Sequence, residues 1–436
     1  MISLLSRYFN FKSFEMEKPK ETEQKVYTKT LIPGLIHLVK NDDTLKYLLK
    51  TDEKLCIVEH YREDGKVFQP KTDLPIEFVS KNILEIIPKQ HTINAKGILD
   101  QTISFIKKYL ELPFDQGYLI LALWVFHTYL MEKFDVTPIL YFFGTKETGK
   151  TRAGETLSKI SFMSERLTSP TEASLFRSAH LFKTALVIDE IKLWGADGNK
   201  EVANLIKSRY KRGMKVSRIN MNKQGEDQVE YYDVFAPLVI CSTETMPPII
   251  ESRCITFTMQ QNTNKDVEGD INEGDALMIR EMLTIFRYFY IDKELPTVKA
   301  VTRRRLNEIT RPLLQILEIV DPSRKDELID YVKYLETKKA DEESESTECE
   351  IVKCLIEEDD LIQGRKISTT AVTGVLNREQ DEKSKYSSRY ISSCLKRLGF
   401  DKVRLNDGKM GFKYDPNLLS RLAIKYQLKL KDTEGY

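Results

Sequence analysis

The sequence lacks an excess of charge of either sign and lacks long apolar runs. Lys and Arg total 67 against 66 Asp and Glu, which gives a net charge of +1 over 436 residues. A uniformly basic nucleic-acid-binding surface is therefore excluded, and any basic surface must be local. No apolar run reaches the ~20 residues that a membrane-spanning helix requires. We therefore expect no membrane partner.

Cysteine is also sparse. The six cysteines are scattered through apolar runs, and none forms a Cys-x-x-Cys pair. They are too few and too dispersed for a disulfide scaffold, and their spacing does not suit a zinc site. The first twenty residues show no basic stretch followed by an apolar run, so we expect no secretory signal. Together these features predict a reducing, cytoplasmic setting.

Hydrophobic residues make up 41% of the chain, which is enough for a sizeable core. At roughly 100–200 residues per domain, the length predicts two to four domains. We place a small, mostly β N-terminal domain at 1–92 and a central domain at 93–335. An acidic linker follows at 336–348, and a C-terminal domain at 349–436. The central domain divides into a helical lead-in (93–135), a core (136–262) and a helical lid (270–335).

Short apolar runs alternate with helical patterns in the central core. They lie at 139–143, 185–188, 237–241 and 254–259. None alternates with polar residues, which is typical of parallel strands covered on both faces. The central core is therefore predicted to be α/β, with a doubly wound parallel sheet flanked by helices.

The first of these runs is followed directly by a glycine-containing motif. It fits G-x4-G-K-[ST] and consists of Gly144, Thr145, Lys146, Glu147, Thr148, Gly149, Lys150 and Thr151. A strand before it and a helix after it supply the context that a phosphate-binding P-loop needs. Backbone N–H groups and Lys150 would bind the phosphates, and Thr151 would ligate Mg²⁺. This motif predicts ATP and Mg²⁺ as cofactors.

The next apolar run ends in two carboxylates, Asp189 and Glu190. Asp189 at the strand end would hold Mg²⁺, directly or through water, and Glu190 would polarise an attacking water as a general base. A buried strand that simply meets a polar loop is the alternative. The P-loop about 40 residues upstream favours the catalytic interpretation.

A basic segment follows. Between Lys207 and Lys223 there are seven basic residues and no acidic one. The segment is predicted to lead into a β-hairpin with Lys223 near its tip, and Arg212, Arg218 and Lys223 are its candidate DNA contacts. A solvated basic helix face is the alternative, and some of these arginines would otherwise sense nucleotide at a subunit boundary.

Taken in order, these motifs resemble a known family. After the hairpin comes a strand that ends Cys241-Ser242-Thr243-Glu244, and then a segment containing Glu251-Ser252-Arg253. The chain resembles AAA+ helicases of the superfamily 3 and minichromosome-maintenance (MCM-like) groups, in the versions carried by plasmids, viruses and integrated mobile elements. The resemblance covers roughly residues 98–320 and implies a P-loop AAA+ core.

The resemblance also implies roles for individual residues. Arg253 matches the arginine finger that completes the site of a neighbouring subunit, and Lys223 matches the tip of the hairpin that contacts DNA. Thr243 stands where such enzymes usually place a sensor Asn, so this chain departs from the pattern there. Arg311 is preferred to Arg305 as the second sensor. An ordinary surface arginine is the alternative for Arg253. A homo-oligomeric ring, a hexamer in this group, is implied.

The C-terminal domain is predicted to be a winged helix-turn-helix. Helical patterns at 351–362, 369–377 and 387–398 precede a hairpin that turns at Asp407-Gly408. Residues 378–413 hold ten basic and five acidic residues. The candidate DNA contacts are Arg389, Lys396 and Arg397 on the third helix and Arg404 and Lys409 on the wing. A protein-contact or ring-regulating module is the alternative.

The sequence therefore predicts an ATP-dependent DNA helicase, a ring-forming motor that translocates on DNA for replication of a mobile element. Its expected partners are single-stranded DNA in the channel, duplex DNA at the winged helix, and a primase or other replication proteins. One alternative is a non-unwinding AAA+ ATPase that loads or remodels a protein on DNA, as an initiator or a transposition regulator. Another is a nucleotide-gated DNA-binding module with slow turnover.

Overall fold

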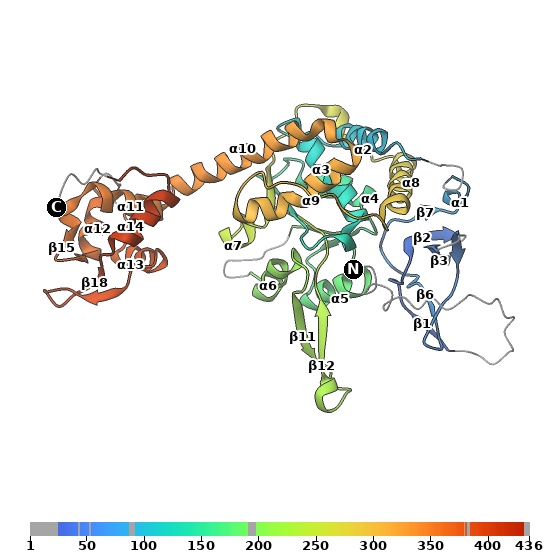
Figure 1. The fold of residues 1–436 in the computed structure, drawn as a ribbon, viewed down its shortest axis with the longest axis horizontal. Helices are drawn as coiled ribbons and strands as arrows, with labels where there is room; N and C mark the ends of the chain where they lie inside the picture. The colour runs from blue at the N-terminus through green and yellow to red at the C-terminus, as the bar shows by residue number, and fades with distance from the viewer. Residues whose placement is uncertain are drawn as a thin grey trace, which may run out of the picture. The chain divides into compact units, whose positions relative to one another are not determined.

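A computed structural model describes residues 25–41, 44–51, 54–86, 92–190, 198–378, 380–381 and 384–430. The chain forms two compact units, which are described separately (Figure 1). Unit 1 comprises Met1–Val298 and Glu308–Pro322, and unit 2 comprises Lys299–Asn307 and Ser323–Tyr436. Among the described residues, no helix combines the length and apolarity needed to cross a membrane.

Unit 1 begins with two small sheets, one of order β4-β3-β2-β7 and one of order β1-β6-β5. The elements are β1 (Val26–Thr28), β2 (Leu35–Asn41), β3 (Thr44–Lys50), β4 (Leu55–Val58), β5 (Tyr61–Glu63), β6 (Lys66–Gln69), β7 (Val79–Ser80) and α1 (Ile83–Ile86). A hairpin turns at Asp64-Gly65, because β5 and β6 pair antiparallel around these two residues. Asp64 and Gly65 have φ of 50° and 73°, as a type I′ turn requires.

The N-terminal strands are joined to the rest of unit 1 through helix α8 (Glu273–Tyr290). Ile285 of α8 packs with Ile36, Val39, Leu48, Val79 and Ile83 in one buried cluster. Arg280 of α8 is only 3% exposed. Its Nε donates to the carbonyl of Phe78 at 2.9 Å and its Nη1 to the carbonyl of Lys159 at 2.7 Å. These two hydrogen bonds therefore join α8 to the segment before β7 and to α4 (Lys150–Ile160). The domain boundary at residue 92 stays a prediction.

The centre of unit 1 is a parallel sheet of five strands with order β14-β8-β13-β10-β9. The strands are β8 (Ile139–Phe143), β9 (Glu165–Thr168), β10 (Leu186–Asp189), β13 (Leu238–Ser242) and β14 (Cys254–Thr258). Four of them coincide with the apolar runs in the sequence, so the α/β fold with a parallel sheet is confirmed. The edge strand β9 was missed because its residues are alternately half-buried and exposed.

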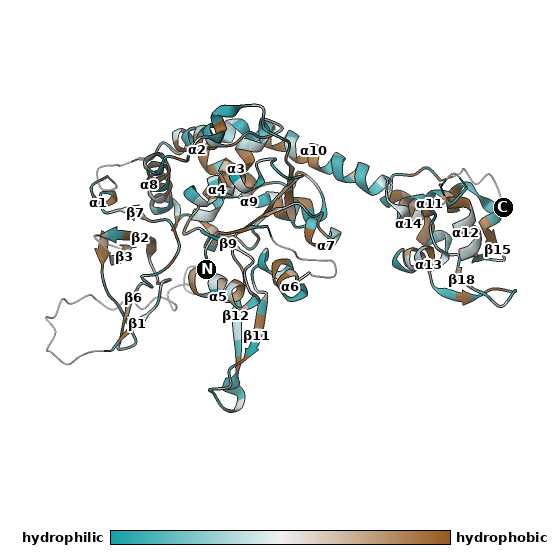
Figure 2. Cartoon of the chain, turned by 180° about the vertical axis from the view of Figure 1, so that it is seen from behind, coloured by the Kyte–Doolittle hydropathy of each residue, from teal (hydrophilic) through white to brown (hydrophobic). Residues whose placement is uncertain are grey.

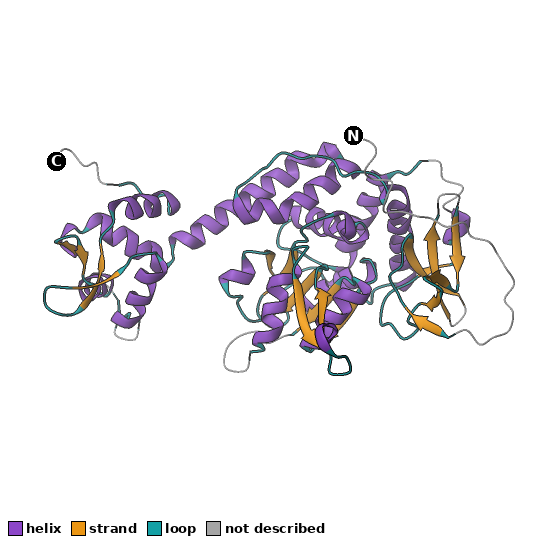
Figure 3. Cartoon of the chain, turned by 60° about the horizontal axis from the view of Figure 1, so that its bottom comes forward, coloured by secondary structure: helices purple, strands orange, loops and turns teal. Residues whose placement is uncertain are grey.

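Helices pack around this sheet (Figure 3). They are α2 (Ala95–Tyr109), α3 (Gln116–Tyr129), α4 (Lys150–Ile160), α5 (Glu172–Phe182), α6 (Lys200–Arg209), α7 (Pro248–Glu251), α8 and α9 (Arg304–Val320). Hydrophobic residues dominate α3, which is buried almost throughout (Figure 2). Trp124 of α3 is fully buried and donates its indole N–H to the carbonyl of Pro138 at 2.8 Å. This helix is therefore core and offers no surface for a ligand.

The hairpin predicted after the basic segment is present. β11 (Lys215–Ile219) and β12 (Val229–Asp233) pair antiparallel, with Lys215 opposite Asp233 and Ile219 opposite Val229. In Figure 1 the hairpin extends away from the body of unit 1, beside α5 and α6. Lys223 lies in the connection between its two strands.

Unit 2 contains helices and a four-stranded sheet of order β15-β16-β18-β17. The elements are α10 (Lys325–Ser344), α11 (Thr347–Glu357), β15 (Ile362–Gln363), β16 (Lys366–Ile367), α12 (Thr369–Leu376), α13 (Ser388–Arg397), β17 (Lys402–Arg404), β18 (Met410–Lys413) and α14 (Pro416–Lys425). Ile351, Leu355, Ile391, Cys394 and Phe412 belong to its buried core. Most of the residues predicted as an acidic linker are helical, because α10 continues to Ser344. The linker and its boundaries stay predictions.

Candidate functional site

The glycine-containing loop connects β8 to α4, and its backbone explains the choice of residues. Gly149 and Glu147 have φ of 78° and 62°, in the left-handed region. A Cβ on Gly144 would lie 2.7 Å from the carbonyl oxygen of Met259 and 2.8 Å from Oγ1 of Thr148. The loop can therefore close tightly only with glycine at that position. It leads directly into the N-terminus of α4, whose unpaired N–H groups favour an anion.

Lys150, the first residue of α4, is held inside the loop. Its side chain is only 8% exposed, and its Nζ donates to the carbonyl of Thr145 and, at 3.3 Å, to Oγ1 of Thr148. Burial lowers the pKa of Lys150 from its ordinary value, although the nearby Cys241, Glu190 and Asp189 act in the opposite direction. The hydrogen-bond partners of the Lys150 ammonium group are neutral oxygens, so its charge is available to neutralise phosphate oxygens.

Thr151 and Asp189 are brought together from α4 and the end of β10. Oγ1 of Thr151 donates to Oδ1 of Asp189 at 3.1 Å, and Asp189 is only 5% exposed. A hydroxyl and a carboxylate oxygen at this separation fit Mg²⁺, which prefers oxygen ligands and keeps several waters or phosphate oxygens in its shell. No group of three or more His, Cys, Asp or Glu side chains suited to a metal occurs in the described ranges. The remaining ligands would therefore be phosphate and water.

A residue that the sequence analysis missed completes this arrangement. Oδ2 of Asp189 accepts a charge-assisted hydrogen bond from Nη2 of Arg166 at 2.9 Å. Arg166 lies on β9, the edge strand beside β10. No local motif marks this residue, because the pairing of β9 with β10 becomes visible only once the strand order is known.

Glu190 follows β10 directly and is exposed. Its backbone N–H donates to the carbonyl of Cys241 at 3.1 Å, and its φ is 57°. A left-handed conformation costs a non-glycine residue free energy, so the surrounding structure must hold Glu190 in place. The turn leaves its carboxylate accessible at the carboxyl edge of the sheet, on the side where the P-loop also begins.

Thr243 comes one residue after β13 and is exposed, whereas Ser242 before it is buried. Because β13 lies between β8 and β10, its carboxyl end lies between the P-loop and Asp189. Oγ of Ser242 accepts a hydrogen bond from the backbone N–H of Glu244 at 3.0 Å, which fixes the chain there.

Arg253 and Arg311 lie apart from this cluster. Arg253 is half-buried, with its guanidinium 5.0 Å from the ring centroid of Tyr210 and donating to the carbonyl of Ile249. Arg311 is exposed on α9. Within the described part of the chain, neither arginine forms a hydrogen bond or ion pair with a P-loop residue. Of the predicted catalytic and metal-binding residues, the described structure brings together Lys150, Thr151, Asp189 and Glu190.

Several basic side chains of the segment from Lys207 to Lys223 are already engaged in contacts within the fold. Arg209 is buried, and Arg212 donates to the carbonyls of Phe134 and Glu132 at 3.0 and 2.8 Å. The other engaged residues form ion pairs, namely Lys211 with Glu308, Arg218 with Glu172, and Lys223 with Glu230. These partners lie outside the segment, so a local charge count could not reveal them. Much of the predicted positive charge is offset within the fold.

The two faces of the hairpin differ. On one face, the Tyr232 ring packs at a tilt against Phe176 of α5 with ring centroids 4.6 Å apart, and Arg218 forms an ion pair with Glu172 of α5. The register places Ser217, Ile219, Val229 and Tyr231 together on the opposite face, which we call the outer face. Ile219 is 68% exposed and Tyr231 63%. The same register adds the pair Lys215 and Asp233 to this side of the hairpin, so its exposed surface combines apolar and aromatic side chains near the tip with charged ones at the base.

The candidate contacts of unit 2 lie on α13, on β17 and in the β17–β18 turn. Arg389, Lys396 and Arg404 are exposed and have no ion pair among the described residues. Arg397 pairs with Glu348 at 2.6 Å, and Lys409 pairs with Asp407 at 3.5 Å. Three of the five predicted contacts are therefore free cations.

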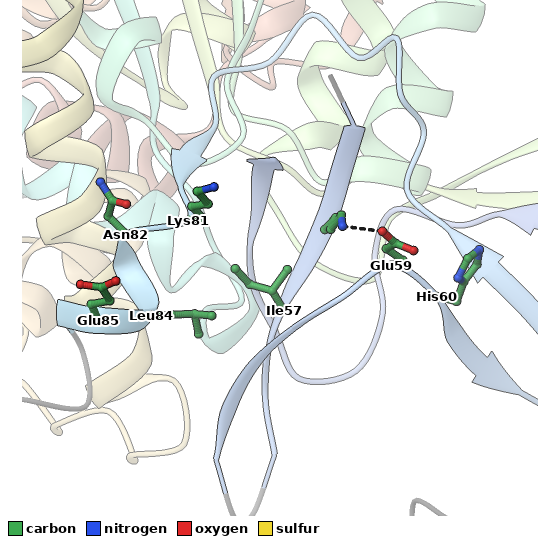
Figure 4. Close-up of a pocket in the computed structure, with 8 residues that line it drawn as sticks. Ile57, Glu59, His60, Lys81, Asn82, Leu84 and Glu85 are labelled. Atoms are coloured by element: carbon green, nitrogen blue, oxygen red, sulfur yellow. Dashed lines mark ion pairs between the residues drawn. The ribbon is translucent and has the colours of Figure 1, made fainter. Parts of the chain in front are cut away.

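A separate cavity of about 710 Å³ lies in the N-terminal part of unit 1 (Figure 4). Residues of β3, β4, α1 and the adjoining turns line it, and two of the lining residues, Lys46 and Glu59, form an ion pair. None of the predicted site residues takes part in its lining. The P-loop cluster is therefore formed independently of this cavity.

Comparison with known proteins yields only distant structural likenesses. No protein-family model matches the chain, and no curated protein matches it by sequence. An apo structure of the NrS-1 C-terminal region (305–718) is 13% identical, with a TM-score of 0.33 over 86% of this chain and 95% of that one. A full-length MCM homologue from Methanopyrus kandleri is 12% identical, with a TM-score of 0.37 over 69% and 76%. A JCV helicase is 13% identical, with a TM-score of 0.26 over 53% and 62%.

Proposed function

We propose that this protein is an ATP-dependent DNA helicase, a ring-forming AAA+ motor that translocates on DNA for replication of a mobile element. The observation that carries the proposal is the convergence of Lys150, Thr151, Asp189 and Glu190 at the carboxyl edge of one parallel sheet. This set contains a phosphate-binding cation, two metal-binding oxygens and an accessible carboxylate, which are the groups that ATP hydrolysis needs.

Each residue has a distinct task in the proposed reaction. Lys150 turns from the loop carbonyl to the β- and γ-phosphate oxygens of ATP, while Thr151 and Asp189 hold Mg²⁺. The metal, when bound, offsets the charge that develops on the phosphates. Glu190 accepts a proton from the water that attacks the γ-phosphorus, and the bond to the ADP oxygen breaks.

The proposed site is completed by a neighbouring subunit. Arg253 would leave its carbonyl partner and reach the γ-phosphate bound next door, where its charge stabilises the transition state. Thr243 would orient the attacking water by its hydroxyl, and Arg311 would contact the nucleotide as a second sensor. A homo-oligomeric ring, which we take to be a hexamer, follows from an arginine supplied in trans.

DNA contact is assigned to the hairpin and to unit 2. Lys223 and the outer face are accessible parts of the hairpin, whereas Arg218 is paired with Glu172 of α5 and Arg212 is bonded to the carbonyls of Phe134 and Glu132. We propose that a single strand runs along the hairpins of the ring. Helices α12 and α13 with the β17–β18 hairpin would form a winged helix-turn-helix, in which Arg389, Lys396 and Arg404 contact duplex DNA.

A second candidate function is an AAA+ ATPase that loads or remodels a protein on DNA without unwinding it. The exposed Ile219 and Tyr231 on the outer face favour this alternative, because an apolar surface also suits a protein partner. Both candidates require the same nucleotide site.

Strand displacement on a forked DNA duplex distinguishes them. The full chain is assayed with ATP, and Lys150→Ala serves as the inactive blank. Unwinding by the native chain alone supports the helicase. ATP hydrolysis with a closed fork, across salt and tail variants, would reject it in favour of the loader, with a replication protein such as a primase as the partner to seek.

A further inference from the structure

We infer that Arg166 is the positioning residue for the metal-binding carboxylate of Asp189. This inference rests on the proposed nucleotide site and adds a residue that the P-loop pattern does not contain. The direct observation is the 2.9 Å contact between Nη2 of Arg166 and Oδ2 of Asp189.

The strand register explains how Arg166 reaches the site. In the parallel ladder, Arg166 is opposite Val187 and Thr168 is opposite Asp189, so all four side chains project from one face of the sheet. A Cβ on Gly154 of α4 would lie 2.9 Å from Cγ1 of Val187, which identifies this face as the one that α4 covers. Arg166 therefore extends along the α4 side, toward the end of β10.

The two oxygens of Asp189 have separate partners. Oδ1 accepts from Thr151, and Oδ2 accepts from Arg166. With Oδ2 occupied, the carboxylate cannot rotate away, and Oδ1 stays beside the hydroxyl that would share the metal. Hydrogen bonds of this kind to a metal-binding carboxylate typically strengthen metal affinity or activity by 10–100-fold.

The charge of Arg166 matters as well as its geometry. Asp189 is 5% exposed, and a buried carboxylate without a counter-charge is costly. The side chain of Arg166 is 35% exposed, so it fills no core volume that a substitution would empty. Replacing it should therefore change the site without unfolding the chain.

A competing role for Arg166 would be a direct contact with phosphate. In that case the arginine would strengthen nucleotide binding even without metal. A positioning role instead acts only through Asp189 and thus only when Mg²⁺ is present. The two roles differ in the metal dependence of nucleotide binding.

The test measures binding of a fluorescent, non-hydrolysable ATP analogue to the full chain, across a Mg²⁺ titration and in EDTA. Arg166→Gln should raise the Mg²⁺ concentration for half-maximal binding about 10–100-fold and leave binding in EDTA unchanged. Arg166→Lys, which keeps the charge but not the planar fork, should lie between Arg166→Gln and the native chain. Arg177→Gln, on the neighbouring α5, is the control and should match the native chain.

An unchanged Mg²⁺ requirement in Arg166→Gln would overturn the inference while leaving the nucleotide site intact. A loss of affinity in EDTA as large as that in Mg²⁺ would also overturn it, in favour of a phosphate contact. If Arg166→Gln fails to fold, as judged by thermal unfolding, Arg166→Lys decides the matter by the same criteria. Absence of binding by the native chain would remove both this inference and the proposed function.

Discussion

At the scale of single residues, the P-loop can close only because Gly144 has no Cβ. A Cβ at position 144 would meet the carbonyl of Met259, and the backbone N–H of Met259 is itself bonded to the carbonyl of Phe143 at 2.6 Å. The Met259 carbonyl is backbone, and the other near atom, Oγ1 of Thr148, is bonded to the carbonyl of Thr145 at 2.9 Å, so the loop itself would have to move. The shape of the loop is therefore coupled to the packing of β14 beside β8.

Gly144→Ala should consequently weaken nucleotide binding by at least about tenfold and lower the free energy of unfolding by about 1–3 kcal/mol, as overpacking typically does. Fluorescent-nucleotide titration and thermal unfolding measure the two effects. Gly269→Ala is the matched control, since a Cβ there meets nothing within 4 Å. Native-like binding by Gly144→Ala would show that the loop tolerates the displacement.

Two buried histidines make stability depend on pH. Burial lowers the pKa of both His37 and His127 from 6.5 to about 3. Below pH 6.5 the unfolded chain binds protons that the folded chain does not, so the unfolding free energy falls as the pH drops toward 3. Each histidine contributes up to about 1.4 kcal/mol per pH unit. Stability from these groups is fully present above pH 6.5.

In His127→Phe, the unfolding free energy should therefore fall less steeply as the pH drops below 6.5. Neither ring nitrogen of His127 has a hydrogen-bond partner in the described structure, and the ring lies 4.4 Å from that of Phe134, so a phenyl ring suits the site. Thermal midpoints between pH 4.5 and 7.5 are compared with those of the native chain and of His60→Phe, an exposed control. An equally steep decline in His127→Phe would contradict the assignment.

At the scale of elements, the sequence predicts features specified within a few residues and misses contacts between segments that are distant in the sequence. The P-loop, the apolar runs of β8, β10, β13 and β14, the β11–β12 hairpin and the turn at Asp407-Gly408 were predictable, because each is specified within a few residues. The contact between Arg166 and Asp189 was not, since it needs β9 to pair with β10. The free charge of the basic segment was overestimated because Glu172, Glu230 and Glu308 lie elsewhere in the sequence.

On the β11–β12 hairpin, Lys223 and Tyr231 lie in different surroundings, which gives them different expected roles in DNA binding. Lys223 is bound to Glu230, whose pKa is held at about 2 by hydrogen bonds from Tyr232, Asn220 and Lys223. Tyr231 is 63% exposed on the outer face. If a single strand follows the hairpin, Lys223 contributes a phosphate contact and Tyr231 contributes stacking on a base.

These two contributions can be separated by their salt dependence. Lys223→Ala should reduce the salt slope of single-stranded DNA binding by about one, as loss of one phosphate contact does. Tyr231→Ala should cost about 1–3 kcal/mol at every salt concentration and leave the slope unchanged. Fluorescence polarisation with a labelled oligonucleotide measures both.

Tyr231→Phe, which keeps the ring, should bind like the native chain. Unchanged DNA affinity in Tyr231→Ala would argue against base stacking and would favour a protein partner for the outer face.

At the scale of the whole molecule, the proposed function requires more than one chain. Lys150, Thr151, Asp189 and Glu190 meet within unit 1, but Arg253 lies against Tyr210 and contacts none of them. With Lys150 as its phosphate cation but no arginine finger, a hydrolysis site lacks a contribution typically worth 10³–10⁵ in rate. In the proposed function, an arginine supplied by a second copy would make up this deficiency, and activity would then depend on the interface.

Mixing two inactive variants tests this directly. Lys150→Ala removes the phosphate cation of a subunit's own site, and Arg253→Ala removes the group offered to its neighbour. In randomly mixed oligomers of the two, about one interface in four combines an intact Lys150 with an intact Arg253. Steady-state ATP hydrolysis by an equal mixture should therefore recover to roughly a quarter of the native rate, although each variant alone is inactive.

The control replaces Arg253→Ala with the Lys150→Ala/Arg253→Ala double variant, mixed with Lys150→Ala. No subunit in that mixture has an intact Lys150, so hydrolysis should stay at the level of the single variants. If the first mixture also stays inactive, although size-exclusion chromatography shows mixed oligomers, Arg253 does not act across the interface. The cation at the γ-phosphate must then come from within the chain, with Arg311 as the first residue to substitute.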